Sequence, residues 1–367
     1  MPKWSDFGNI WTTLRELDVN AIREEAERPL VIAAVGHESA LDELDRLLHS
    51  GPNRYPAGPN PLELIPLTQA ASRAAGIDHA DMLVLAVDAR RALTPAEVEA
   101  FGRLESLALP FLVVLIRAEQ LPAGEAALPP SVNARMIAIP DSNALDAADR
   151  LAGAFLSRLP GELQLSAARR LPGLRATYAR ELIGSVSFTN ATYALASGLP
   201  EQIPIVSVPF AAADILILTK NQALLVYKLA LAYGAAPDFQ ARIREVLPVI
   251  GGAFLWRQAA RSLIGLIPIW GLVPKIAISY AGTYTTGIAA WRWYDSGEIV
   301  SSDQLKRISS EALTIGRARA TELIGRARAA GSQAGARVQA HGGGFLAWIK
   351  RILSRRRKPP ELTPPQQ

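Results

Sequence analysis

The stretch "VIAAVGHESALDELDRLL", residues 31–48, decides the fold of the N-terminal half of this chain. Its first part is a run of apolar residues that ends at Gly36. Its second part repeats leucine at the spacing of one helix face. A buried strand that passes through a glycine into an amphipathic helix is typical of an α/β domain, and phosphate-binding loops begin in the same way. The stretch therefore raises the question of whether its turn holds a nucleotide.

Similar apolar runs recur along the first 160 residues and predict further strands. Three of them are strong and a fourth is weaker: residues 82–89, 111–118 and 134–141, with 62–67 as the weaker run. Amphipathic patterns between and after them predict helices at residues 39–49, 94–109 and 142–159. The helix at 94 has the strongest start signal, because Thr94 is followed by Pro95 and Glu97 in the order of a capping box. Continuous apolar strands that alternate with helices predict an α/β domain at 29–160, with a mostly parallel sheet and helices on both faces.

The turn after Gly36 lacks the residues that bind a triphosphate. A Walker-type loop needs a second glycine, a lysine and a hydroxyl residue at fixed distances from the first glycine. The matching positions hold Leu41, Asp42 and Glu43. The glycines let backbone N–H groups surround phosphate and the lysine neutralises it, whereas carboxylates here would repel it. We therefore predict a degenerate phosphate loop.

The segment "ADMLVLAVDARRALTPAEVEAFGRLESLALPFLVVLIRAEQL", residues 80–121, resembles the later core strands of Era-like GTPases and the helix between them. In that family the second of these strands ends in the guanine-reading motif N-K-x-D. Its matching positions here include Ile116, Arg117 and Glu119, so the asparagine is lost and the charged residues are changed. The family's D-x-x-G motif would follow residues 62–67, and it is absent. The resemblance thus implies a GTPase-like fold that has become a pseudo-GTPase.

Two other interpretations of this domain remain open. One is an unrelated doubly wound domain. The other is a GTP-binding protein or GTPase with a non-standard phosphate loop, which would need a cation such as Arg90 or Arg117 near Gly36. The chain has no cysteine, and its four histidines show no metal-ligand spacing and lie in no nucleophile motif. We accordingly predict no catalytic residue, no cofactor and no metal site.

The strand pattern stops after residue 160. Pro-Gly pairs at 160–161 and 172–173 predict a linker at 161–175, followed by a hydrophobic helical domain at 176–300. An amphipathic pattern also predicts a helix within residues 1–28. Several stretches resemble, in order, the uncharacterised helical domain that follows Era-like GTPase domains in bacterial proteins and recurs in YcjF-like membrane proteins. They are "LPGLRATYARELI" (171–183), "FTNATYALASGLPEQIPI" (188–205), "AADILILTKNQALLVYKLALAYG" (212–234) and "IPIWGLVPKIAISYAGTYTTGIAAWRWYDSG" (267–297), with "IWTTLRELDVNAIREEAERP" (10–29) as a similar lead-in helix. This resemblance implies the architecture and a membrane association, not a reaction.

The apolar segments of the helical domain allow two structures. Prolines interrupt residues 203–291, and the longest uncharged helical piece, 276–291, reaches about 24 Å, short of a bilayer core of about 30 Å. A buried helical hairpin and insertion into a membrane both fit this pattern. Tryptophans that flank the region suit a membrane interface.

The C-terminal part, residues 301–358, is strongly basic. Eleven lysines and arginines and one acid lie between Arg317 and Lys358, while the whole chain carries a net charge of +5. The helix "FLAWIKRILSRRRK" (345–358) combines an apolar stripe with cations, as interfacial helices do. Its predicted membrane-contacting residues are Phe345, Trp348, Ile349, Lys350, Arg351, Ile352, Leu353, Arg355, Arg356, Arg357 and Lys358. A solvated charged end and nucleic-acid binding are the alternatives. The final residues, 359–367, have the composition of a disordered end.

Together these patterns predict a non-enzymatic scaffold or interaction protein at the cytoplasmic face of the bacterial inner membrane, in peripheral or integral association. Its expected partners are an anionic lipid surface and an unknown protein, and no nucleic acid is expected. Its expected architecture is a GTPase-like α/β domain, a hydrophobic all-α domain and a basic amphipathic C-terminal helix.

Overall fold

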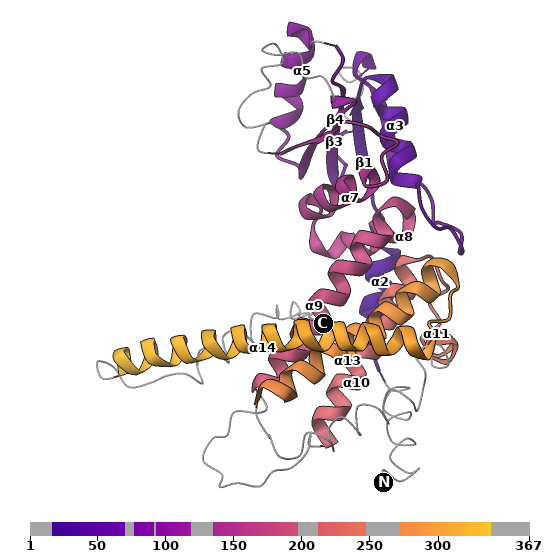
Figure 1. Cartoon of the computed structure of the whole chain (residues 1–367). Coiled ribbons are helices and arrows are strands. Elements are labelled where there is room, and N and C mark those ends of the chain that lie inside the picture. The colour runs from indigo at the N-terminus through magenta and orange to yellow at the C-terminus, as the bar shows by residue number, and fades with distance from the viewer. Residues whose placement is uncertain are drawn as a thin grey trace, which may run out of the picture.

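The computed structural model describes residues 17–69, 77–91, 93–118, 135–196, 212–246 and 272–338. Within these residues five parallel strands form one sheet in the order β2-β1-β3-β4-β5. The strands are β1 (Ile32–Gly36), β2 (Leu62–Pro66), β3 (Met82–Asp88), β4 (Phe111–Ile116) and β5 (Met136–Ile139). The predicted parallel sheet is therefore confirmed (Figure 1). The weak run at 62–67 is one of its edge strands.

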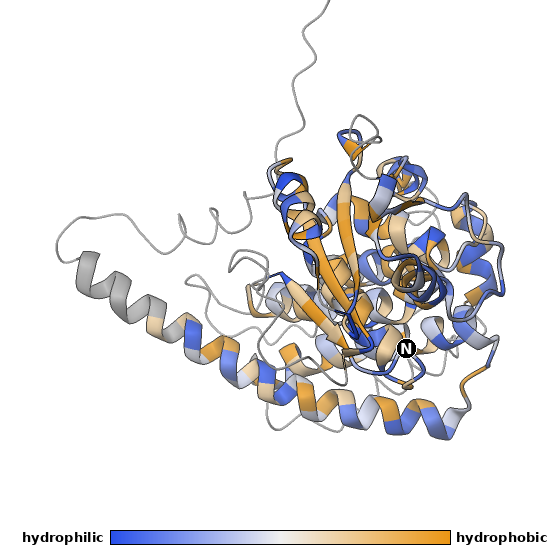
Figure 2. Ribbon diagram, turned by 90° about the horizontal axis from the view of Figure 1, so that it is seen from above, coloured by the Kyte–Doolittle hydropathy of each residue, from blue (hydrophilic) through white to orange (hydrophobic). Residues whose placement is uncertain are grey.

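Helices cover both faces of this sheet, as the continuous apolar strands require. Every residue of β1, β3 and β4 is buried. Alternate side chains such as Ala34 and Val84 pack with α3 (Glu38–His49) and α7 (Ala147–Arg158) on one face. Their neighbours, such as Val35 and Leu85, pack with α5 (Pro95–Glu105) on the other face. Seen from above, the strands are the most hydrophobic ribbons of the molecule (Figure 2).

Two helix starts test the sequence signals directly. The capping box of α5 is confirmed, because the Thr94 hydroxyl accepts the N–H of Glu97 and the Glu97 carboxylate accepts the N–H of Thr94. The helix predicted from residue 142 is α7, which begins only at Ala147. The Asp141 carboxylate accepts the N–H of Asn143 at 2.8 Å, and this local turn replaces the first helical hydrogen bonds.

The predicted linker at 161–175 is mostly helical and mostly buried. It contains η3 (Gly161–Leu163), α8 (Gln164–Arg170) and η4 (Pro172–Leu174). Its apolar side chains belong to one hydrophobic core that continues from the face of the sheet that carries α3 into the C-terminal helices. The two Pro-Gly pairs therefore mark breaks between short helices, and the two halves of the chain share a core at this point.

Arginines of this junction bind the ends of neighbouring helices. Arg169 donates to the carbonyl oxygens of Leu231 and Ala235, at the end of α10 (Ala212–Ala232). Arg170 donates to the carbonyl of Glu27, the last residue of α2 (Asn20–Glu27). Carbonyl groups at a helix C-terminus lack partners within the helix, so these cations satisfy them and complement the helix dipole.

The described residues of the C-terminal half form helices joined by short irregular segments. Besides α10 it contains α9 (Arg175–Ala196), α11 (Phe239–Val246), α13 (Leu272–Ser296) and α14 (Ser302–Val338). Helix α13 packs along both α9 and α14, and α14 is the long yellow helix that crosses the molecule in Figure 1. No helix among the described residues combines the length and the apolar character needed to cross a membrane. The predicted α/β region followed by a helical region is thus confirmed.

The core of this helical region carries a polar seam. The buried Asn190 amide donates to the Thr283 hydroxyl at 2.8 Å, and the Asn221 amide donates to the Asn190 side-chain oxygen at 2.6 Å. The Ser279 hydroxyl donates to the backbone carbonyl of Asn190. Because buried polar groups are costly without partners, this seam fixes the relative rotation of α9, α10 and α13.

The loop between α3 and β2 docks on the helical region. The Tyr55 hydroxyl donates to Glu245 of α11 at 2.8 Å. The Arg54 guanidinium lies 4.3 Å from the ring centroid of Trp293 and donates to its carbonyl. Gly234 has a φ of +90°, and a Cβ there would lie 2.9 Å from the carbonyl oxygen of Pro56. The close approach of this loop therefore requires glycine at that position.

Several sequence predictions fall on residues outside those described. They are the first 16 residues of the N-terminal amphipathic helix, Glu119, parts of the apolar segments within 203–291, the basic helix 345–358 and the end at 359–367.

Candidate functional site

The candidate site lies at the carboxyl ends of β1, β3 and β4. In open α/β sheets ligands bind at this edge, where the strand order reverses, and the order 2-1-3-4-5 places that point between β1 and β3. His37 follows β1, Asp88 ends β3 and Arg117 follows β4. The topology thus brings these three side chains together from distant parts of the sequence.

Gly36 has a packing role at this edge. A Cβ at this position would lie 2.0 Å from the carbonyl oxygen of Ala86 on the neighbouring strand. Only glycine allows β1 and β3 to approach so closely where the chain turns into α3. The glycine that opens the phosphate-loop pattern is therefore explained without a phosphate.

The other phosphate-loop positions point in different directions. Leu41 is buried in the core beneath α3, and Asp42 is exposed. Glu43 faces the site, where it forms ion pairs with Arg46 at 2.6 Å and with Arg117 at 3.4 Å. The hydrogen bond from Arg46 lowers the pKa of Glu43, and a hydrogen bond with Ser142 acts in the same direction. Of the two carboxylates predicted to repel a phosphate, only that of Glu43 faces the site, and it is paired.

Asp88 is the centre of the site. One of its carboxylate oxygens accepts the Ser39 hydroxyl at 3.1 Å, the Arg90 guanidinium at 3.0 Å and the Arg117 guanidinium at 2.9 Å. Its other oxygen accepts the backbone and side-chain N–H groups of Arg90, both at 3.1 Å. The hydrogen bonds from Arg90, foremost, hold the pKa of Asp88 far below its usual range. The buried carboxylate is therefore ionised and fully paired.

Arg117 reaches this carboxylate from a strained backbone. Its φ is +59°, in the left-handed region that residues other than glycine rarely adopt. The conformation aims one nitrogen of its guanidinium at Asp88 and the other at Glu43. Strain of this kind persists only where the surroundings compensate for it, and two ion pairs provide that compensation here.

His37 closes the site on its other side. His37 is 7% exposed, and its Nδ1 accepts the backbone N–H of Asp88 at 3.1 Å. Nε2 lies 3.5 Å from the Glu97 carboxylate and 3.2 Å from Nε of Arg91. Burial, together with the neighbouring Arg91 cation, lowers the pKa of His37. The ring is therefore a neutral bridge between β3 and the start of α5.

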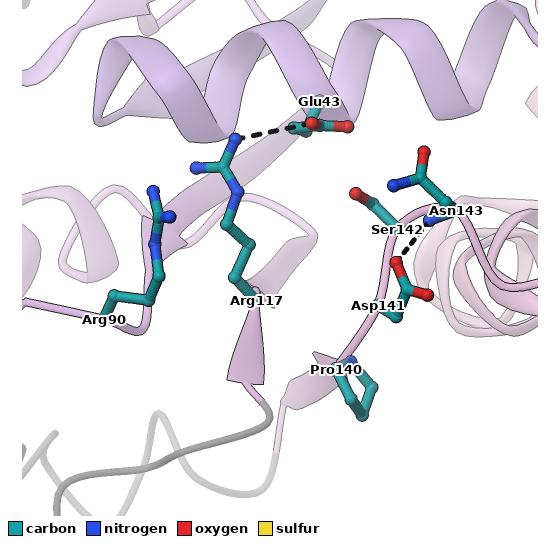
Figure 3. A pocket seen from close by; sticks show the side chains of 7 residues that line it. All are labelled: Glu43, Arg90, Arg117, Pro140, Asp141, Ser142 and Asn143. Atoms are coloured by element: carbon teal, nitrogen blue, oxygen red, sulfur yellow. Dashed lines mark hydrogen bonds and ion pairs between the residues drawn. The ribbon is translucent and has the colours of Figure 1, made fainter.

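A pocket of about 400 Å³ opens beside this network. Figure 3 shows Arg90 and Arg117 on one side of it and the loop after β5 on the other, below α3. Its lining is Glu43, Arg90, Arg117, Pro140, Asp141, Ser142 and Asn143. The volume lies in the range of small-molecule sites. The pocket thus offers hydrogen-bond donors at one end and acceptors at the other.

The structure brings some predicted positions together and separates others. Glu43 and Arg117 meet across the pocket, whereas Ile116 is buried in β4 and Glu119 lies outside the described residues. The sequence analysis missed Asp88 and Ser142. A charged residue at the end of an otherwise apolar strand was the signal for Asp88, and no local signal marks Ser142.

No protein-family model matches this chain, and no curated protein is similar to it in sequence. The described residues contain no group of three or more histidine, aspartate or glutamate side chains placed to hold a metal ion. The arrangement of the site can therefore be interpreted only from its own geometry, which is that of a set of paired charges beside a polar pocket.

Proposed function

We propose that this chain is a non-enzymatic, membrane-associated scaffold or interaction protein. Its α/β domain, which resembles a degenerate Era-like GTPase domain, serves as a protein-binding module and binds no nucleotide. The helical region and the basic C-terminal segment hold this module at the cytoplasmic face of the bacterial inner membrane.

One observation carries the first part of the proposal. Arg90 and Arg117, the cations that a non-standard phosphate loop would need, are both bound to the carboxylate of Asp88. Arg117 also contacts Glu43. A nucleotide that recruited these arginines would have to separate them from two carboxylates, which would then stay beside its phosphates. The Asp88 side chain is only 9% exposed, and removing cations from a carboxylate that water reaches poorly is unfavourable.

Titration of the purified chain with a fluorescent GTP analogue and Mg²⁺ tests this part. We expect no saturable, magnesium-dependent binding below about 1 mM, which corresponds to a binding free energy of about −4 kcal/mol. A matched double variant, Asp88→Asn with Glu43→Gln, frees both arginines and should bind the nucleotide more tightly than the parent chain. Micromolar, magnesium-dependent binding by the parent chain would overturn the proposal.

The same arginines favour the alternative, a GTP-binding protein or GTPase with a non-standard loop. They lie at the carboxyl edge of the sheet, where doubly wound domains bind their ligands. The titration distinguishes the two functions. If the domain is a nucleotide site, the parent chain must bind the nucleotide with Asp88 and Glu43 in place.

The membrane part of the proposal rests on the sequence of the C-terminal segment. Basic residues near an anionic lipid surface contribute about 1 kcal/mol each, and apolar side chains on the same helix add to this affinity. Fractionation of cells that express the full chain, or a version truncated after Gly344, tests it. The full chain should sediment with membranes and the truncated chain should be released, or become extractable by a high-salt wash.

Two other outcomes would contradict this anchoring. A full chain that stays in the soluble fraction would exclude membrane attachment. A truncated chain that resists a salt wash would show that residues within 203–291, and not the basic helix, hold the protein to the membrane.

A further inference from the structure

The pocket beside Asp88 has charges of both signs, and this restricts the ligands that fit it. Arg90 and Arg117 line one end, Glu43 lies above them, and Asp141 and Asn143 line the other end (Figure 3). Two guanidinium groups and two carboxylates make the lining neutral in sum. A triphosphate would bring several negative charges against Glu43 and Asp141, so the lining disfavours it.

Arg90 retains donors that face outward. Its Nε and one Nη group are bound to Asp88, while its side chain is 61% exposed. A guanidinium has five N–H donors, and Nη1 of Arg90 has no acceptor among the described residues. The outer edge of this group can therefore bind one further carboxylate without breaking its pair with Asp88.

The opposite end of the pocket suits N–H donors. The Asp141 carboxylate accepts one hydrogen bond, from the N–H of Asn143, and a carboxylate can accept several.

We propose that this pocket binds a carboxylate group at Arg90, carried by a ligand that also offers N–H donors to Asp141. An acidic side chain within a peptide segment has both groups, because the backbone of the segment supplies the N–H donors. A small free carboxylic acid has only the first group. This inference rests on the proposed function, because it names the chemistry by which the interaction module recognises its partner.

Site-resolved chemical footprinting tests this proposal on the full chain. Phenylglyoxal modifies exposed arginines, and mass spectrometry gives the rate at each position, so the arginines of the basic C-terminal segment do not interfere. Arg103 is the matched control, because its side chain is 66% exposed and lies in a surface ion pair with Glu99. The probes are the capped peptide Ac-Leu-Glu-Leu-NH₂, its glutamine counterpart, glutarate and Mg·GTP.

We expect the glutamate peptide to slow modification of Arg90 by about four-fold at about three times its dissociation constant. The glutamine peptide should give no protection, and Arg103 should be unaffected by any probe. Stronger protection by the peptide than by glutarate identifies a protein segment as the source of the carboxylate. Equal protection by both would show that N–H donors to Asp141 contribute nothing, and it would overturn the proposal that a peptide segment is the ligand.

Three other outcomes would overturn the inference: no protection of Arg90 by either carboxylate, equal protection of Arg103, or equal protection by the glutamine peptide. Protection by Mg·GTP gives a separate answer. If Mg·GTP and the carboxylates both protect Arg90, the proposal that the domain binds no nucleotide is wrong, while the carboxylate site is supported. If GTP alone protects it, both fail.

Discussion

The guanidinium of Arg175 donates to the carbonyl of Pro52 at 2.7 Å, although the two residues are 123 positions apart. Arg175 is fully buried, and it also donates to the carbonyl oxygens of Ala168 and Arg169. Burial lowers its pKa to about 10, which leaves it charged at neutral pH. One side chain thus ties the loop after α3 to α8 and α9, at the junction between the sheet and the C-terminal helices.

Replacement of this arginine should weaken the whole fold. A lysine ammonium cannot reach three carbonyl groups in a planar fork, so Arg175→Lys should lower the free energy of unfolding by about 2–4 kcal/mol. Urea denaturation followed by circular dichroism measures the change. Arg180→Lys is the control, since its partly exposed pair with Asp149 should contribute less than about 1 kcal/mol. Equal effects of the two substitutions would contradict the role of Arg175.

The contact between Gly36 and Ala86 predicts a steric effect. In Gly36→Ala the new methyl group would meet the Ala86 carbonyl at 2.0 Å, so β1 and β3 would have to separate. We expect a loss of about 2–3 kcal/mol, as for other overpacked cores. Gly102 in α5 has open space around it, and Gly102→Ala should stabilise the chain by about 0.5–1 kcal/mol. Thermal unfolding of both variants should therefore show shifts of opposite sign.

Asp88 makes the free energy of unfolding depend on pH in the acidic range. Its pKa is lowered in the folded state, so its contribution is present above the unfolded pKa of about 3.9 and is lost as the pH falls towards the folded value. Asp88→Asn should cost about 2–3 kcal/mol at pH 7. Urea titrations at each pH measure the free energy of unfolding. The difference in this free energy between the variant and the parent chain should become smaller between pH 5 and pH 3. A constant difference would show that Asp88 is not the ionised centre of the site.

A control for this experiment is available on the surface. Glu99 is 72% exposed and pairs with Arg103 one turn further along α5. Glu99→Gln should change the free energy of unfolding at pH 7 by less than about 0.5 kcal/mol.

His37 predicts a second dependence on pH. Burial and Arg91 lower its pKa, so the unfolded chain binds a proton near pH 6.5 while the folded chain resists it. The contribution of the neutral ring is present above pH 6.5 and is lost as the pH falls through the folded pKa. His37→Gln should therefore reduce the fall in unfolding free energy between pH 7 and pH 5. The exposed His79 is the control for the substitution itself, and His79→Gln should leave the free energy of unfolding at pH 7 unchanged.

Local patterns in the sequence predicted most of the sheet. Buried parallel strands are apolar on both faces, so five runs identified five strands, and the capping box of Thr94 placed the start of α5 within one residue. The predicted start of α7 was wrong, because the Asp141 carboxylate accepts the N–H of Asn143 and this local turn competes with helix formation. The linker prediction at 161–175 did not foresee buried helices there, since Pro-Gly pairs break a helix equally well in a linker and in a core.

The candidate site depends on contacts between distant residues, which the sequence alone does not predict. The sequence established that the turn after Gly36 lacks the lysine and the hydroxyl residue of a phosphate loop, because the motif requires these residue types at fixed positions along the chain. It could not establish that Glu43 and Asp88 both pair with Arg117, since the three residues come from three elements and meet only when the strands pair. Charge pairing depends on distance in space, and only the tertiary structure decides whether neighbouring carboxylates repel a ligand or are already neutralised by arginines.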